Sequence, residues 1–187
     1  KEYKLLDKNF PTIDPKKPYA LTKEEEDIME RLERAFENCE KLQRHMHFLL
    51  NKGGLYKVYN GNLLYHGCVP LKEDGNLKSV RIFGRAYKGK GLYEVLESYV
   101  RKGFYAMDPK EKERGKDIMW YIWLSENSPL FGKDKMATFE RYFLSEKETH
   151  KEKKNPYYLL LEDEKVVEKI LKEFGLENED AHIINGH

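Results

Sequence analysis

The sequence predicts a mixed α/β (α+β) fold, and three patterns along the chain support this prediction. Asn60-Gly61 lies between two short runs rich in Tyr, Val and Leu. Such a pair is a strong sign of a two-residue hairpin, because both turn positions need φ > 0. Apolar residues recur at helical spacing on both sides of this hairpin, and a last apolar run occupies residues 181–184. Helices are therefore expected to be combined with a few short strands.

The first helix is expected to follow an irregular lead-in, residues 1–21, which is polar and contains three prolines. Thr22 and Glu25 fit a capping box, in which each side chain bonds to the backbone of the other residue. The apolar spacing that follows predicts one helix from Thr22 to about Asn51, ended by Gly53-Gly54.

The hairpin is expected to include the strand Asn62–Tyr65, and the region from 71 to 180 is expected to be mainly helical. Val80–Phe83 is expected to form a short strand, and residues 84–91 a flexible entry to the next helix. Further helices are predicted at 92–105, 117–125, 136–144 and 163–174. The segment 117–125 is apolar nearly all round, which indicates burial. Residues 146–154 are interpreted as a solvated run of charges.

Residues 84–91, GRAYKGKG, nearly match the phosphate-binding loop G-x-x-x-x-G-K-[ST]. The last position is Gly91, so the hydroxyl that holds magnesium in such loops is missing. Loose matches of this kind arise by chance, and nucleotide binding is not predicted here.

Composition excludes several classes of function. Charged residues make up 36% of the chain but nearly balance, with a formal net charge of +1, so no basic excess is available to neutralise nucleic-acid phosphates. The sequence shows neither a signal peptide nor an apolar run long enough to span a membrane. Cys39 and Cys68 lie far apart, which indicates neither a zinc ribbon nor a disulfide framework. A reducing, cytoplasmic setting is expected.

Two histidines stand at the ends of predicted strands. His66-Gly67 follows the second hairpin strand, and Asn185-Gly186-His187 follows the final apolar run. An imidazole at a strand end, beside a glycine that lets the chain bend away, is well placed to bind a metal. One hypothesis is a metal site built from distant parts of the chain. The alternative is that each histidine is a polar turn residue.

Four longer strings resemble the class III fructose-1,6-bisphosphatases: YNGNLLYHGCVP, MWYIWLSENSPLFGKDKMATFERYFL, THKEKKNPYY and HIINGH. That family is similar to the calcineurin-like metallophosphoesterases, and the resemblance extends over essentially the whole chain. It implies a manganese-dependent hydrolase that removes the 1-phosphate of fructose 1,6-bisphosphate in gluconeogenesis. It also implies part of a metallophosphoesterase-type β-sandwich. In that arrangement 22–70 and 181–187 each end in a metal-ligand histidine, and 71–180 forms a largely helical insertion.

The resemblance further implies roles for individual residues. His66 and His187 are implied as metal ligands, supported by Gly67, Asn185 and Gly186, and the implied cofactor is Mn²⁺, with two ions in the full-length enzyme. The second phosphate of the substrate needs cationic groups. The candidates lie in the string SPLFGKDKMATFERYF and are Lys133, Lys135 and Arg141. The alternative for these three is that they are surface charges beside acidic neighbours.

The superfamily's aspartate motifs D-x-H, G-D-x-x-D-R-G and G-N-H-[DE] supply the bridging aspartate, further ligands and the catalytic histidine. All three are expected to lie N-terminal to this region and not within residues 1–187. We therefore expect an internal fragment of a larger enzyme, with part of the metal site, no catalytic residue of its own and no activity when isolated.

Two other classes of function stay open. The same chemistry serves protein phosphatases and nucleotide phosphoesterases, so another phosphorylated substrate is one alternative. The other is a segment used for assembly or regulation, with histidines in structural roles. The expected partner is a small sugar bisphosphate, with no nucleic acid and no membrane, and a homo-oligomer is left open.

Overall fold

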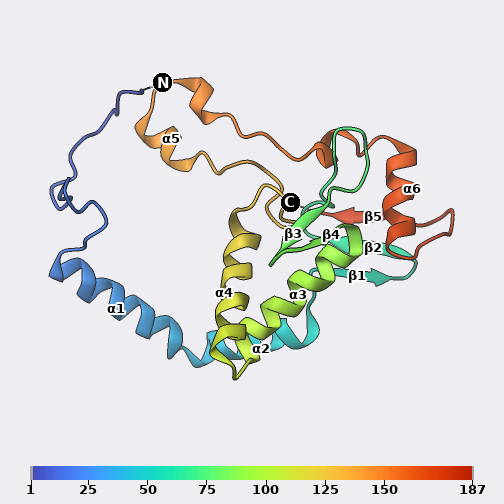
Figure 1. Cartoon of the computed structure of the whole chain (residues 1–187), viewed down its shortest axis with the longest axis horizontal. Helices are drawn as coiled ribbons and strands as arrows, with labels where there is room; N and C mark the ends of the chain where they lie inside the picture. The colour runs from blue at the N-terminus through green and yellow to red at the C-terminus, as the bar shows by residue number, and fades with distance from the viewer. Residues whose placement is uncertain (1, 187) are drawn as a thin grey trace. The chain divides into compact units, whose positions relative to one another are not determined.

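The computed structural model describes residues 2–186, and the chain divides into two compact units (Figure 1). The first unit combines Lys1–Gly53 with Thr138–His150, and the second combines Gly54–Ala137 with Lys151–His187. Helices and small sheets together make a mixed α+β architecture, which confirms the coarse fold class. Within residues 2–186, no helix combines the length and the apolar character that a membrane span requires.

The first unit contains α1 (Lys23–Glu37), α2 (Glu40–Lys52), α5 (Thr138–Phe143) and the 3₁₀ turn η1 (Lys147–His150). The lead-in is tied to α5, because the Leu6 N–H donates to the Phe143 carbonyl oxygen at 2.8 Å. The rings of Phe10 and Phe143 also lie 5.7 Å apart. Segments far apart in sequence therefore meet within this unit.

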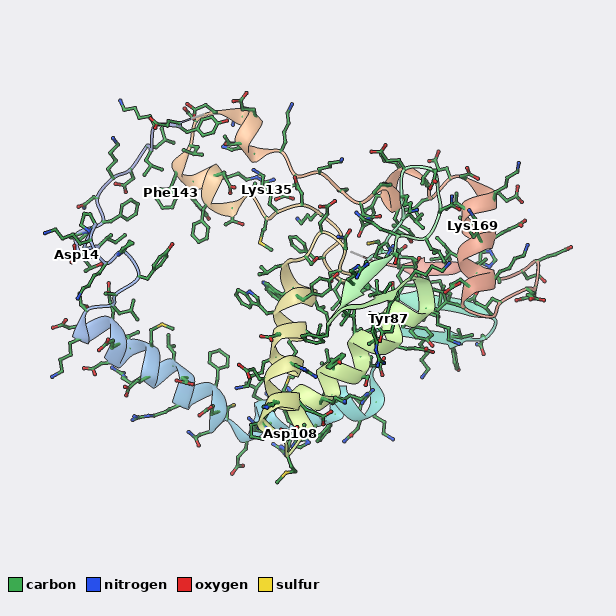
Figure 2. The ribbon with its side chains drawn as sticks, viewed as in Figure 1. Asp14, Tyr87, Asp108, Lys135, Phe143 and Lys169 are labelled. Atoms are coloured by element: carbon green, nitrogen blue, oxygen red, sulfur yellow. The ribbon has the colours of Figure 1, made fainter. Side chains whose placement is uncertain are left out.

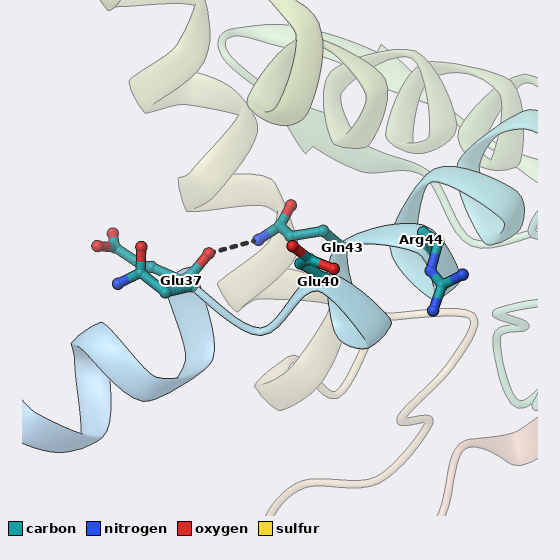
Figure 3. Close-up of a pocket in the computed structure, with 5 residues that line it drawn as sticks. Glu37, Glu40, Gln43 and Arg44 are labelled. Atoms are coloured by element: carbon teal, nitrogen blue, oxygen red, sulfur yellow. Dashed lines mark hydrogen bonds between the residues drawn. The ribbon is translucent and has the colours of Figure 1, made fainter.

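The single helix predicted from Thr22 to about Asn51 is wrong, although its capping box at Thr22 is confirmed. The helix ends after Glu37, and polar side chains bond to carbonyl groups of its last turn. The Asn38 amide donates to Arg34 O at 2.8 Å. The Gln43 amide donates to Glu37 O at 3.2 Å (Figure 3). Two shorter helices result.

The second unit contains a three-stranded sheet in the order β1-β2-β5. β1 (Tyr56–Tyr59) and β2 (Asn62–Tyr65) form the predicted antiparallel hairpin, and both turn residues have positive φ, 48° at Asn60 and 73° at Gly61. β5 (Ile183–Asn185) pairs in parallel with β2, which confirms the predicted final strand. Since the two strands are parallel, their carboxyl ends lie at the same edge of the sheet.

A second hairpin follows, formed by β3 (Val80–Ile82) and β4 (Arg85–Tyr87, with Tyr87 labelled in Figure 2). The strand at Val80 is confirmed, but the flexible entry expected at 84–91 is wrong, since it contains β4 and the start of a helix. The turn uses Phe83 at φ 44°, a conformation that a bulky residue adopts rarely. The Phe83 ring packs 5.0 Å from the ring of Tyr99, and this tertiary contact accompanies the unusual turn.

Two long helices pack against each other, α3 (Gly89–Tyr105) and α4 (Pro109–Leu124), side by side in Figure 1. Asp108 caps α4 by accepting a hydrogen bond from the Lys110 N–H at 3.0 Å (Figure 2). The helix predicted over 117–125 is confirmed, but its burial all round is wrong. Only one face is buried in the described structure, while Trp120 and Trp123 are 67% and 66% exposed.

The last helix, α6 (Glu164–Glu173), is confirmed. Asp163 caps it by accepting hydrogen bonds from the N–H groups of Lys165 and Val166, and Gly175 follows it at φ 83°. A 3₁₀ turn, η2 (Pro156–Leu159), precedes it. The charge run at 146–154 is less solvated than expected. His150 is half-buried, with its Nε2 3.0 Å from Leu144 O and 3.1 Å from Glu140 O.

The second unit has two apolar clusters. One joins β2 and the chain after it to α3, η2 and α6, and includes Leu63, Tyr65, Cys68, Val69, Leu71, Tyr93, Tyr157, Val166, Ile170, Leu171, Phe174 and Leu176. The other joins β3, α3 and α4 through Val80, Ile82, Leu92, Leu96, Ile118 and Ile122. The first cluster lies directly behind the strand end that carries His66.

We expect Gly115→Ala to destabilise the second unit by about 1–3 kcal/mol or more, because it overpacks the crossing of α3 and α4. A Cβ at position 115 would lie 2.6 Å from Tyr99 O and would overlap the backbone of Gly103. Thermal unfolding followed by circular dichroism should show a midpoint lower by about 2–4 °C for each kcal/mol.

The matched control is Gly91→Ala, also in a helix, where an added Cβ meets no atom within 4 Å among the described residues. That variant should be neutral or stabilising by up to about 1 kcal/mol, since alanine has the better helix propensity. Equal destabilisation by both variants would contradict the close helix contact.

Candidate functional site

The parallel pairing of β2 and β5 brings the two strand-end motifs together. Tyr65 is the register partner of Asn185, and one residue further the Gly186 N–H donates to the His66 carbonyl oxygen at 3.2 Å. The His66 side chain is exposed. His66-Gly67 and Asn185-Gly186 therefore lie side by side in the second unit, although they are far apart in sequence.

The structure tests only part of the predicted ligand pair. His187 lies outside the described residues, so its position relative to His66 stays a prediction. What is observed is the approach of the Asn185-Gly186 backbone to the strand end that carries His66.

The backbone after His66 is held by side-chain and loop contacts. The Asn185 amide donates to Gly67 O at 2.8 Å, and the Cys68 N–H donates to Pro129 O at 2.8 Å. Pro129 belongs to the loop that follows α4, and this loop is itself fixed by Ser128. The fully buried Ser128 hydroxyl donates to Ile122 O at 2.6 Å.

A layer of buried tyrosines lies behind this strand end. The hydroxyls of Tyr65 and Tyr157 are 2.7 Å apart, and the Tyr93 hydroxyl donates to Cys68 O at 2.9 Å. Desolvation raises the pKa of Tyr65 and Tyr93 well above their usual value, and raises the pKa of Tyr157 to about 12. These groups are therefore neutral near pH 7 and form an uncharged support for the site.

The described residues fit a metal site only in part. His66 offers an exposed imidazole, a donor that suits manganese alongside carboxylates. Across residues 2–186, however, no group of three or more His, Cys, Asp and Glu side chains is arranged to hold a metal ion. His66 can thus act as one ligand of a site whose remaining donors lie outside the described residues.

The three candidate phosphate-binding residues fall into different environments. Lys133 is half-buried, and its ammonium group pairs with the Glu152 carboxylate at 2.7 Å. Glu152 also accepts a hydrogen bond from the Ala137 N–H at 2.9 Å, which gives this ion pair a structural role. Lys135, labelled in Figure 2, belongs to the second unit, whereas Arg141 lies on α5 in the first. Contact of all three with substrate stays a prediction.

The near-match to a phosphate-binding loop has a different use in the structure. A phosphate in such a loop binds at the N-terminus of the following helix, where backbone N–H groups are free. At the start of α3 the Glu173 carboxylate accepts a hydrogen bond from the Lys90 N–H at 3.1 Å. This carboxylate takes the place of an anion at that helix end.

Sequence patterns had given no functional indication for one feature that lies beside His66-Gly67. The loop Ser128–Gly132 had shown only a break in helical spacing. The expectation that the D-x-H motif lies outside residues 1–187 is wrong, because Asp180-Ala181-His182 spells this short pattern. Its His182 Nδ1 lies 2.7 Å from Asp180 O. His182 precedes β5 and its carbonyl accepts from the Leu63 N–H, so it lies at the opposite end of the strand pair from His66.

A separate pocket in the first unit contains none of the candidate site residues among its described lining. It lies at the break between α1 and α2 (Figure 3) and is lined by Glu37, Asn38, Glu40, Gln43 and Arg44.

The two cysteines should differ sharply in thiol reactivity. Cys68 is fully buried, and desolvation raises the pKa of its thiol to about 12, whereas Cys39 is exposed. Because the thiolate is the reactive form, we expect iodoacetamide to label Cys39 in the native protein and Cys68 only after unfolding. Peptide mapping by mass spectrometry measures both sites. Rapid native labelling of Cys68 would contradict the packing of this strand end.

Comparison with known proteins gives a consistent result. The family model described as Firmicute fructose-1,6-bisphosphatase matches residues 1–187. Fructose-1,6-bisphosphatase class 3 of Clostridium botulinum (strain Hall) is 54% identical over 188 residues, which cover 100% of this chain and 28% of that protein. Its counterpart in Listeria innocua is 52% identical over 189 residues, covering 100% and 29%.

The comparison with solved structures gives no significant match. The chain spans less than a third of the length of these curated relatives. Because the family match extends over all of its residues, the chain belongs to the Firmicute fructose-1,6-bisphosphatase family.

Proposed function

We propose that this chain is a segment of a longer enzyme that hydrolyses fructose 1,6-bisphosphate to fructose 6-phosphate and phosphate. The observation that carries the proposal is the meeting of His66-Gly67 with Asn185-Gly186 across β2 and β5. In a member of this family, we place the metal-assisted phosphatase centre at that edge of the sheet, because the two strand-end motifs meet there. The names of the relatives support the choice of substrate.

In this proposal His66 and His187 are ligands of Mn²⁺, with the carboxylate ligands supplied by the rest of the polypeptide. When bound, manganese activates a water molecule and neutralises charge on the phosphoryl group. The contribution of this chain is to hold the His66 side chain in position. β2 presents the imidazole of His66 at the sheet edge, and the neutral tyrosine layer behind it adds no competing charge.

The same proposal includes a metallophosphoesterase-type β-sandwich. Among the described residues, β1 and β5 each pair with β2 alone, so both outer edges of this small sheet carry strands without a second partner. Unpaired strand edges readily accept further strands. Additional strands from the longer polypeptide would complete the sheet around the metal centre.

We also propose that Lys133, Lys135 and Arg141 help to bind the second phosphate of the substrate, since Lys and Arg form charge-assisted hydrogen bonds to phosphate. A cytoplasmic enzyme fits this proposal, as both cysteines are free thiols.

The test is phosphate release by the full-length parent enzyme in the presence of Mn²⁺. Fructose 1,6-bisphosphate would be compared with fructose 6-phosphate, a nucleoside monophosphate and a phosphoserine peptide at equal concentrations. We expect the highest kcat/KM for fructose 1,6-bisphosphate and no activity from the isolated chain. A higher kcat/KM for the nucleotide or the phosphopeptide would replace the proposed substrate and keep the chemistry. Hydrolysis of none of the four would contradict the proposal.

A further inference from the structure

Hydrogen bonds from distant parts of the chain hold the backbone of residues 66–68. The His66 carbonyl accepts from the Gly186 N–H at 3.2 Å, and the Gly67 carbonyl accepts from the Asn185 side-chain amide at 2.8 Å. The Cys68 N–H donates to Pro129 O at 2.8 Å. The Cys68 carbonyl also accepts from the Tyr93 hydroxyl at 2.9 Å. Each of the three consecutive residues is therefore held, and all partners are distant in sequence.

The loop Ser128–Gly132 closes against this segment with little space between the two backbones. A Cβ on Gly67 would overlap Pro129 O and would lie 3.0 Å from Leu130 O. On the loop side, Gly132 has φ 60°, and a Cβ there would lie 2.7 Å from the Cys68 sulfur. The strand end therefore cannot move toward the loop.

The loop is anchored by buried polar groups at both of its ends. Ser128 bonds to the end of α4 through its hydroxyl, as described above. At the other end, the Asn155 N–H donates to Gly132 O at 2.8 Å. Asn155 in turn accepts a hydrogen bond from the Leu71 N–H at 3.1 Å, which ties the loop back to the chain that follows His66. The loop is thus a fixed surface.

On the side of the segment 66–68 that faces β5, Asn185 makes a hydrogen bond just beyond the end of the strand pairing. Tyr65↔Asn185 is the last register pair of β2 and β5. The Asn185 side chain reaches beyond it to Gly67 and bonds to the residue that follows His66. Residues 66–68 are therefore held between β5 and the loop, and only the His66 side chain is exposed.

We propose that Asn185 is a positioning residue for the His66 imidazole, which it holds in place by fixing the Gly67 backbone against the loop Ser128–Gly132. The proposal rests on the metal-ligand role assigned to His66 above. A metal ligand must be presented within about 0.5 Å of its productive position. Outer contacts that orient a ligand contribute about 10- to 100-fold to metal affinity or activity. From β5, the Asn185 side chain makes such a contact, because its amide bonds to the Gly67 carbonyl next to His66.

The sheet offers a matched control for this bond. Asn62 stands at the start of β2, and its side-chain oxygen accepts from the His182 N–H at 3.0 Å. It therefore links the same two strands at the end away from His66. Asn62→Ala removes this side-chain bond between the strands, together with the bond from the Asn62 amide to Asn60 O at 3.1 Å, without touching the backbone at Gly67.

The experiment measures Mn²⁺ binding to the metal-free full-length enzyme by electron paramagnetic resonance of free Mn²⁺, together with the unfolding midpoint. For Asn185→Ala we expect the half-saturating Mn²⁺ concentration to rise about 10- to 100-fold. For Asn62→Ala we expect a change of less than about twofold. At saturating Mn²⁺, kcat of Asn185→Ala should return to near the parent value. If Asn185→Ala does not fold, Asn185→Ser, whose hydroxyl ends short of Gly67 O, should give the same shift.

Unchanged Mn²⁺ affinity in Asn185→Ala, or an equal loss in Asn62→Ala, would overturn the positioning role. His66→Ala separates this proposal from the proposed function. If His66→Ala binds Mn²⁺ as tightly as the parent, the positioning role fails whatever the substrate is. If His66→Ala weakens Mn²⁺ binding but the parent does not cleave fructose 1,6-bisphosphate, the proposed substrate fails and the positioning role stands.

Discussion

Replacing His66 with alanine in the full-length enzyme is expected to lower kcat for fructose 1,6-bisphosphate by at least about a hundredfold. A metal ion contributes several kcal/mol to stabilisation of the charged transition state, and each 1.4 kcal/mol corresponds to about a tenfold change in rate. Loss of the imidazole removes a proposed ligand at the edge where β2 and β5 end. The same result is expected for His187→Ala.

Two measurements accompany the rate. Mn²⁺ content after gel filtration should fall in His66→Ala, while the circular dichroism spectrum should stay that of the parent, because the side chain is exposed. His182→Ala is the matched control, since His182 is also exposed and lies at the opposite end of the same strand pair. A fully active His66→Ala with normal Mn²⁺ content would remove His66 from the metal site.

The second large effect is expected at alkaline pH, where the second unit should unfold between about pH 10 and 12. Burial raises the pKa of Tyr65, Tyr93 and Tyr157, the last to about 12, and raises the pKa of Cys68 to about 12. An unfolded tyrosine has a pKa near 10. Above that pH the unfolded chain binds fewer protons than the folded one, so the free energy of unfolding falls as pH rises.

The size of this effect follows from the number of buried groups. Each buried group lowers the free energy of unfolding by about 1.4 kcal/mol for every pH unit between its pKa in the unfolded chain and its higher pKa in the folded chain. For Tyr157 alone this amounts to about 2–3 kcal/mol between pH 10 and 12, and Tyr65, Tyr93 and Cys68 act in the same direction. The stabilisation is fully present below the unfolded pKa values and is lost as pH rises through the folded ones.

Tyrosinate absorbance near 295 nm, recorded together with circular dichroism, tests this expectation. The buried tyrosines should titrate only as the circular dichroism signal is lost, whereas Tyr142 is exposed and lies outside this buried cluster. Tyr157→Phe should make the alkaline transition less steep, whereas Tyr142→Phe should leave it unchanged. Titration of every tyrosine near pH 10 with the fold intact would refute the buried cluster.

Local patterns predicted the elements whose structure depends on neighbouring residues. The Asn60-Gly61 turn was predictable because both residues adopt the positive φ that a tight hairpin requires. The predicted cap at Thr22 satisfies a backbone group only three residues away. Such contacts are visible in sequence because the interacting groups are close along the chain.

The errors occurred where distant contacts or competing side chains decided the outcome. β4 was missed because its turn places the bulky Phe83 at positive φ before Gly84, and the Phe83 ring packs against the distant Tyr99 ring. The break after Glu37 depends on the Gln43 side chain, which a count of apolar spacing ignores. The exposure of Trp120 depends on which face of α4 meets α3. Spacing shows that a face is apolar but not whether it is covered.

The features of the candidate site also fall into those that the sequence predicts and those that depend on distant contacts. The sequence by itself determined the family, the two strand-end motifs and the identity of His66 as a candidate ligand. Only the tertiary structure decided that β5 pairs in parallel with β2, which places Asn185 against Gly67 and the loop Ser128–Gly132 behind it. The physical reason is that one residue of shift along a strand reverses every side chain, and this register is selected by burial and hydrogen bonds between distant segments.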